Sequence, residues 1–274
     1  MDASFDSLVR LVHYAEDVLI LMALVMLCSA RLMVAMLVLP PTSDQALTGM
    51  ARNGLPLWVG LYVAYGQPLD FMKELDMLSY SLLILKEGLI GLLLGFAAST
   101  VFWVAEGVGS MIDNMAGFNN VQQSNPLSGQ QSTPLGNLLS QLSICAFFML
   151  GGLVALVGLV FETYAWWPVR QALPQWGDLL LRFVQKDVAD YLGIVTRVAA
   201  PALITLVLID LAFGLLGRVA DKLEPNSLAQ PVKGAVAMLM IALLVGVFFE
   251  QAKPQLALVD VGRTLSAFFE GAAR

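Results

Sequence analysis

Ionisable side chains inside apolar segments are the residues of this sequence most able to do chemistry. They are Arg31, Lys86, Glu87, Glu106, Glu162, Arg197, Asp210 and Arg218. A charge at the centre of a bilayer costs at least about 2.5–3.5 kcal/mol on insertion scales, so it needs a partner or a function. Glu106, Glu162 and Arg218 lie near segment ends, where a side chain can reach the polar interface. The others fit a proton or ion relay, or structural pairing inside a complex. No ordered series of acids follows one helix, which favours pairing.

Six charged positions are our candidates for buried or interface residues. They are Lys86, Glu87, Asp113, Asp210, Arg218 and Lys233. Asp210 shares a helix face with Gly214 and Gly217, which predicts that it points into a tight helix contact. The sequence leaves open whether Asp210 pairs with Lys233 within the chain or across an interface.

Side chains for catalysis or metal binding are scarce. His13 is the only histidine among 274 residues, which excludes a multi-histidine metal site. The motifs of zinc hydrolases, serine hydrolases, P-loop proteins and dinucleotide-binding proteins are absent from the sequence. The formal net charge of −6 disfavours nucleic-acid binding, because phosphate contacts need clustered Lys and Arg. We therefore expect neither an enzyme nor a cofactor.

The elements that must position these residues are long apolar helices. Hydrophobic residues make up 58% of the chain and charged residues 13%, against about 25% charged in soluble domains. A spanning helix needs roughly 20 apolar residues. The apolar segments are 18–39, 55–65, 78–105, 135–160, 195–216 and 232–249. This predicts an all-α, multi-pass membrane protein with about six apolar helices, of which 55–65 is too short to span comfortably. The break at 225–231 predicts a hairpin between the last two.

Small residues form a stripe along the segment 78–105 and its extension. They are Gly88, Gly91, Gly95 and Ser99, continued by Glu106 and Gly109. Glycine in a membrane helix lets another backbone approach closely. The stripe fits packing within the chain or against a partner subunit. Its acidic end needs shelter from lipid, which favours an assembly.

The connection between the third and fourth apolar segments is polar but carries no charge. No Asp, Glu, Lys or Arg occurs from residue 114 to residue 161. Residues 117–134 consist largely of amides, hydroxyls, glycine and proline. Such side chains can satisfy non-helical backbone at membrane depth without the desolvation cost of ions. The segment is therefore either a loop held in a protein cavity or pore, or a flexible external loop.

Three blocks of residues follow one another along the chain. The first contains Glu106, Gly109, Asp113 and Gly117 and continues from Asn125 through Ser-Gly-Gln-Gln-Ser to Gly136. The second is Ala-Pro-Ala-Leu-Ile at 200–204 with Asp-Leu-Ala at 210–212. The third is Asn226-Ser227-x-x-Gln230-Pro231-Val232-Lys233. In this order the blocks resemble the SctT/FliR family of type III secretion and flagellar export proteins, and the Ser-Gly-Gln-Gln-Ser loop is more similar to its virulence branch.

The resemblance implies a structural subunit of an export gate. Residues 1–191 would be SctR-like and residues 192–274 an SctS-like helical hairpin. The implied partners are SctR-, SctS-, SctU- and SctV-like subunits, unfolded secreted proteins and membrane lipid, at the bacterial inner membrane within the basal body. In the family the loop helps to plug the closed pore. The residues implied here are Phe118, Asn119, Gln122, Gln123, Asn125, Pro126, Ser128, Gln130 and Gln131.

A secondary transporter for a small solute is the alternative. Transporters often contain internal repeats with broken helices at matched positions. We find no convincing inverted repeat, and Lys86-Glu87 has no counterpart in the second half of the chain.

Overall fold

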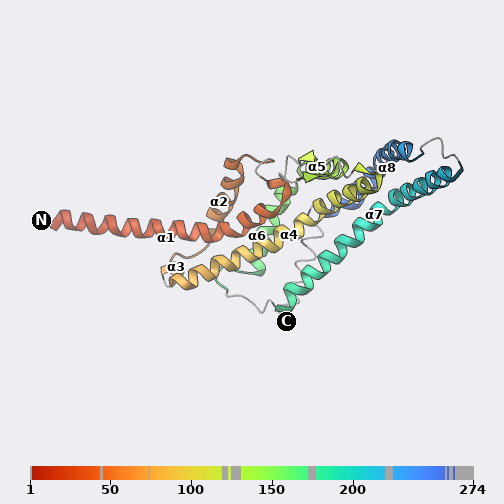
Figure 1. Cartoon of the computed structure of the whole chain (residues 1–274). Coiled ribbons are helices and arrows are strands. Elements are labelled where there is room, and N and C mark those ends of the chain that lie inside the picture. The colour runs from red at the N-terminus through yellow and green to blue at the C-terminus, as the bar shows by residue number, and fades with distance from the viewer. Residues whose placement is uncertain are drawn as a thin grey trace. The chain divides into compact units, whose positions relative to one another are not determined.

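The computed structural model describes residues 2–43, 46–73, 75–118, 123–124, 131–171, 177–219, 225–256, 258 and 262 (Figure 1). Within them the chain is helical, with eight α-helices and one two-residue β-ladder. The contacts divide the chain into two compact units. Unit 1 comprises residues 1–96 and 157–174, and unit 2 comprises residues 97–156 and 175–274. The prediction of an all-helical protein is confirmed, apart from that short ladder.

Unit 1 is built on α1, which runs from Asp2 to Val38. A short 3-10 helix, Pro40–Thr42, ends it at the two prolines and α2 follows at Gly49–Tyr65. Helix α3 is a single turn, Asp70–Lys73. Helices α1 and α2 pack on each other, and the core includes Leu24, Leu27, Cys28, Ala64 and Val169.

Helix α4 extends from Met77 to Ala116 and contributes to both units. At a rise of 1.5 Å per residue, its 40 residues are about 60 Å long, twice the thickness of a bilayer core. It continues well past residue 105, where we expected the apolar segment to end. It stops at Gly117, whose φ of +85° is a left-handed conformation that favours glycine at a helix C-terminus.

The predicted span at 135–160 is broken in the structure. Helix α5 runs from Pro134 to Met149, with proline at its first position, and α6 runs from Gly152 to Trp166. The two are bent by 69° at the break. Gly151 lies at the break with a φ of +74°, a left-handed conformation that ends α5 and changes the direction of the chain. The apolar segment predicted at 135–160 is therefore present, but as two helices that together could form one broken span.

Unit 2 ends in two long helices that pack against each other, as predicted. Helix α7 is continuous from Gly177 to Val219, and α8 runs from Pro225 to Leu256 (Figure 1). The amphipathic stretch before residue 192 therefore belongs to the same helix as the apolar stretch after it. Pro225 and Pro231 both lie inside α8, so residues 225–231 are helical and do not form the predicted break. Pro225 is the first residue of α8, where proline is tolerated because the first N–H groups of a helix have no helical partner.

The described residues include four helices that are long and apolar enough to cross a membrane, or five if α5 and α6 form one broken span. The four are within α1, α4, α7 and α8. Helix α2, which contains the segment 55–65, is not among them, in agreement with its predicted shortness.

Candidate functional site

The uncharged loop is held together at its base by a β-ladder. Residues Gln123–Ser124 (β1) pair antiparallel with Gln131–Ser132 (β2), with Gln123 opposite Ser132. Two main-chain segments eight residues apart are thereby joined. Of the predicted plug residues, Asn119, Gln122, Asn125, Pro126, Ser128 and Gln130 lie outside the described residues.

Asp113 of α4 fixes the end of the loop that returns to α5. Its Oδ2 accepts hydrogen bonds from the backbone N–H groups of Leu135, at 2.8 Å, and Gly136, at 3.4 Å. The first N–H groups of a helix have no helical acceptor, and a carboxylate satisfies them and the positive end of the helix dipole. Thr133, the N-cap residue, makes no cap hydrogen bond itself. Asp113 is completely buried and caps α5 from a neighbouring helix.

Gly109 allows the same two helices to meet backbone to backbone. A Cβ atom at Gly109 would lie 2.5 Å from the Cα of Gly136, and a Cβ at Gly136 would lie 2.7 Å from the Oγ of Ser110. Thr133 adds a hydrogen bond from its Oγ1 to the Oγ of Ser110, at 3.1 Å. The last turns of α4 and the first turn of α5 thus form a close frame for the loop.

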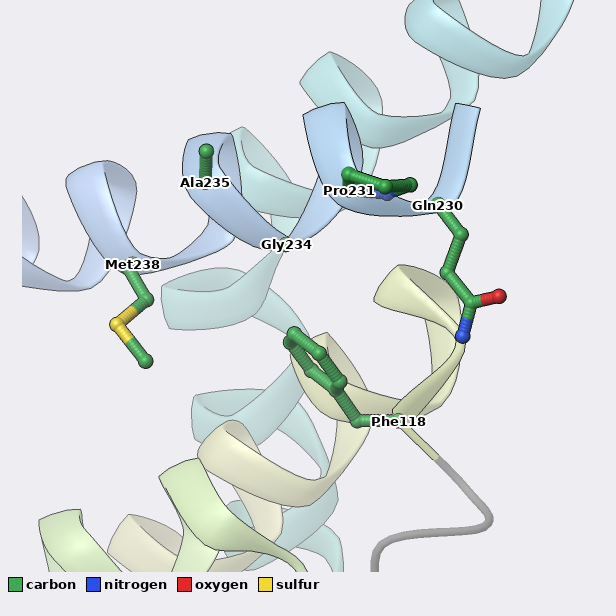
Figure 2. Close-up of a pocket in the computed structure, with 6 residues that line it drawn as sticks. All are labelled: Phe118, Gln230, Pro231, Gly234, Ala235 and Met238. Carbon is green, nitrogen blue, oxygen red and sulfur yellow. The ribbon is translucent and has the colours of Figure 1, made fainter. Parts of the chain in front are cut away.

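The end of the loop that leaves α4 contacts α8. The side-chain Nε2 of Gln230 donates a hydrogen bond to the carbonyl of Gly117 at 3.0 Å. Figure 2 shows Gln230 reaching from α8 toward the end of α4, with the Phe118 ring directed at Gly234. These residues line an open groove of about 580 Å³ with Pro231, Ala235 and Met238. Phe118 is the only predicted plug residue whose side chain is described.

A buried cluster of charges occupies unit 1. The Nε of Arg31 on α1 lies 2.8 Å from Oε2 of Glu87 on α4, and the Nζ of Lys86 lies 2.9 Å from Oε1 of the same carboxylate. All three side chains are at most 1% exposed. Two cations share one anion, so the remaining donors need neutral acceptors.

Those acceptors come from α6 and the residues after it. Arg31 donates to Thr163 Oγ1 at 2.8 Å and to the carbonyl of Trp167 at 3.1 Å. Its guanidinium also lies 3.9 Å from the centre of the Tyr164 ring, a cation–π contact. Lys86 donates to the carbonyls of Pro168, Val169 and Gln171, at 3.3, 2.7 and 3.1 Å. The cluster joins α1, α4 and the end of α6, and no sequence pattern indicated which partners it would have.

Asp210 and Lys233 pair within the chain. Their atoms Oδ1 and Nζ lie 2.9 Å apart and connect α7 to α8. The Asp210 side chain is 46% exposed, and a Cβ at Gly214 would have no neighbour within 4 Å. Among the described residues, Gly214 on this face of α7 therefore does not show the expected tight contact. Arg218 is exposed in the last turn of α7, where a cation suits the helix dipole.

The small-residue stripe lies against other helices of the same chain at several positions. A Cβ at Gly91 would collide with the Arg31 backbone, and one at Gly95 would lie 2.7 Å from the Ala35 carbonyl oxygen. Gly109 contacts α5, as described above. Gly88 meets only a side chain at ordinary distance, Ser99 is buried and Glu106 is half-buried. Gly91, Gly95 and Gly109 thus serve packing within the chain.

Sequence reasoning missed Gln230 and Gly234 as site residues. The sequence did contain an indication of Gln230, because this residue belongs to the third block that carries the family resemblance. Among the described residues, no group of three or more His, Cys, Asp or Glu side chains could hold a metal ion.

Comparison with known sequences covers most of the chain. Residues 22–258 match the sequence model of the family described as Bacterial export proteins, family 1. The chain is 34% identical over 214 residues to the Yop proteins translocation protein T of Yersinia pestis, covering 78% of this chain and 82% of that protein. It is 27% identical over 208 residues to the surface presentation of antigens protein SpaR of Salmonella typhimurium, covering 75% and 76%. It is also 29% identical over 171 residues to the flagellar biosynthetic protein FliR of Bacillus subtilis, covering 62% and 66%.

Proposed function

The chain belongs to the SctT/FliR family of bacterial export proteins, and on that premise we propose that it is a structural subunit of a type III secretion export gate. With SctR- and SctS-like subunits it forms the inner-membrane pore through which unfolded proteins leave the cell. SctU- and SctV-like proteins are the other neighbours in the basal body. The similarity to a Yop translocation protein and to SpaR supports the virulence branch. Four or five apolar helices suit a multi-pass membrane protein.

The division into two family-like parts is included in this proposal. Residues 1–191 correspond to the SctR-like part and residues 192–274 to the SctS-like hairpin. The packing of α7 on α8, with the Asp210–Lys233 ion pair between them, supports the hairpin. The boundary lies inside the continuous helix α7, so the two parts would be joined without a flexible linker.

The observation that carries the functional proposal is a charge-free loop with both ends fixed. Asp113 holds the returning end, Gln230 contacts the leaving end, and the β-ladder closes the base. A freely hydrated external loop would need no such supports. A segment that closes a pore must be held in place and must satisfy its backbone without ions. The loop is therefore proposed as the plug of the closed gate.

Deleting residues 124–132 is expected to make the assembled gate leak ions or small solutes. The deletion removes the loop but leaves Asp113, Gln230 and the α4–α5 frame intact. Conductance of the purified gate complex in planar bilayers measures the leak, and subunit composition by mass spectrometry controls for assembly. Unchanged conductance in a fully assembled complex would contradict the proposal that the loop is the plug.

The transporter alternative has lost support. The sequence already spoke against it, because Lys86-Glu87 has no counterpart in the second half of the chain. In the structure Glu87 pairs with Arg31 and Lys86, and Lys86 also donates to the Val169 carbonyl, which favours a structural network over an ion site.

A further inference from the structure

We propose that Gln230 and Gly234 of α8 are positioning residues that latch the base of the loop, so that the α7–α8 hairpin sets whether the loop stays closed. This inference deepens the proposed function and rests on it. The two residues neither line the α4–α5 frame nor belong to the loop. Their contacts are with Gly117 and Phe118, the first two residues of the loop.

The hydrogen bond from Gln230 addresses a group that the helix cannot satisfy itself. The last carbonyls of an α-helix lack helical donors. The left-handed Gly117 ends α4, and the Nε2 of Gln230 reaches the Gly117 carbonyl at 3.0 Å across 113 positions of sequence. A primary amide is a suitable donor here, because it adds no charge to an uncharged segment. The contact is exposed, so its contribution is that of one ordinary hydrogen bond.

Gly234 provides room for the Phe118 ring. A Cβ atom at Gly234 would lie 2.7 Å from the Cζ of Phe118 and 3.4 Å from its Cε1. Figure 2 shows the ring pointing at this position on α8, one helical turn from Gln230. The glycine therefore lets the aromatic ring contact the α8 backbone. A side chain there would push the ring away and move the start of the loop with it.

The same turn of α8 is tied to α7. Lys233, adjacent to Gly234, forms its ion pair with Asp210 at 2.9 Å. Residues 230–234 thus contact α4's end on one side and α7 on another. A displacement of the α7–α8 hairpin would break the Gln230 and Phe118 contacts first, because they are one hydrogen bond and one ring contact. Breaking them frees the leaving end of the loop while Asp113 still holds the returning end.

Substitutions at Gln230 separate donor chemistry from size. In the intact gate complex, Gln230→Met keeps the length but removes the donor. We expect it to raise the conductance of the closed complex about two- to tenfold, the loss of one hydrogen bond. Gln230→Asn retains a neutral amide donor on a shorter side chain and should leak less than Gln230→Met. Gly234→Leu should leak at least as much as Gln230→Met. Leu228→Ala changes an exposed α8 side chain outside the groove and is the matched control.

A second measurement reports the position of the loop base directly. The variant carries Cys28→Ala, Cys145→Ser and Asn119→Cys. The rate at which a membrane-impermeant maleimide labels position 119 then reports how accessible the start of the loop is. Gln230→Met is expected to raise that rate about two- to tenfold, and Gln230→Asn is expected to raise it less.

The two measurements together separate the latch from the plug. If deleting residues 124–132 leaks but Gln230→Met changes neither conductance nor labelling, the latch is overturned and the plug stands. If the deletion does not leak, the plug is overturned, and a raised labelling rate still supports the latch as an anchor of the loop base. An unchanged labelling rate overturns the latch in either case.

Discussion

At the residue scale, the charges buried in unit 1 are explained by one another. Burying the charges of Arg31 and Lys86 costs free energy. Glu87 neutralises one of the two charges. Four carbonyls, one hydroxyl and one aromatic ring contact the remaining donors. The sequence favoured structural pairing over a relay, and the geometry is that of pairing. It could not indicate the partners, because Arg31 and Glu87 are 56 positions apart and the carbonyls carry no signature in the sequence.

Replacing Glu87 with alanine should strongly destabilise the protein. It would leave two buried cations without an anion, and breaking a buried ion pair costs about 3–5 kcal/mol. The measurement is thermal unfolding of the purified protein in mild detergent. The exposed pair of Lys73 with Asp17, about half-exposed on each side, is the control: Lys73→Met should cost less than about 1 kcal/mol. Equal losses for the two variants would contradict a central role for the cluster.

At the element scale, glycines decide where helices meet and where they stop. Gly91 and Gly95 admit the α1 backbone, and Gly109 admits α5. Gly117 and Gly151 end helices in left-handed conformations. Helical spacing revealed the stripe, but it could not reveal which helix would cover it. Hydropathy likewise found the apolar segment 135–160 but not its bend, because both halves are equally apolar and only Gly151 marks the break.

A methyl group at Gly95 should destabilise the contact between α1 and α4. Its Cβ would lie 2.7 Å from the Ala35 carbonyl oxygen, and overpacking typically costs about 1–3 kcal/mol. Gly54 is the matched control, since a Cβ there meets nothing within 4 Å. Gly54→Ala should stabilise helix α2 by about 0.5–1 kcal/mol. Thermal midpoints in detergent that move in the same direction for both variants would refute the close-packing account.

At the scale of the whole molecule, the low charge content reflects burial within protein as well as contact with lipid. The charged cluster is enclosed in unit 1, and the charge-free loop is supported from three sides in unit 2. Composition alone predicted a helical membrane protein, and ordered motifs predicted the family. Neither could predict the contact of α8 with the loop base, because it depends on tertiary structure between residues 113 positions apart.

The central claim is that the chain functions as one subunit of a multi-subunit export gate. Affinity purification of the full-length chain from its own bacterium in mild detergent, followed by mass spectrometry, tests this claim most directly. The account predicts recovery in one stable complex with SctR- and SctS-like proteins. Recovery as a stable monomer without those partners would contradict it.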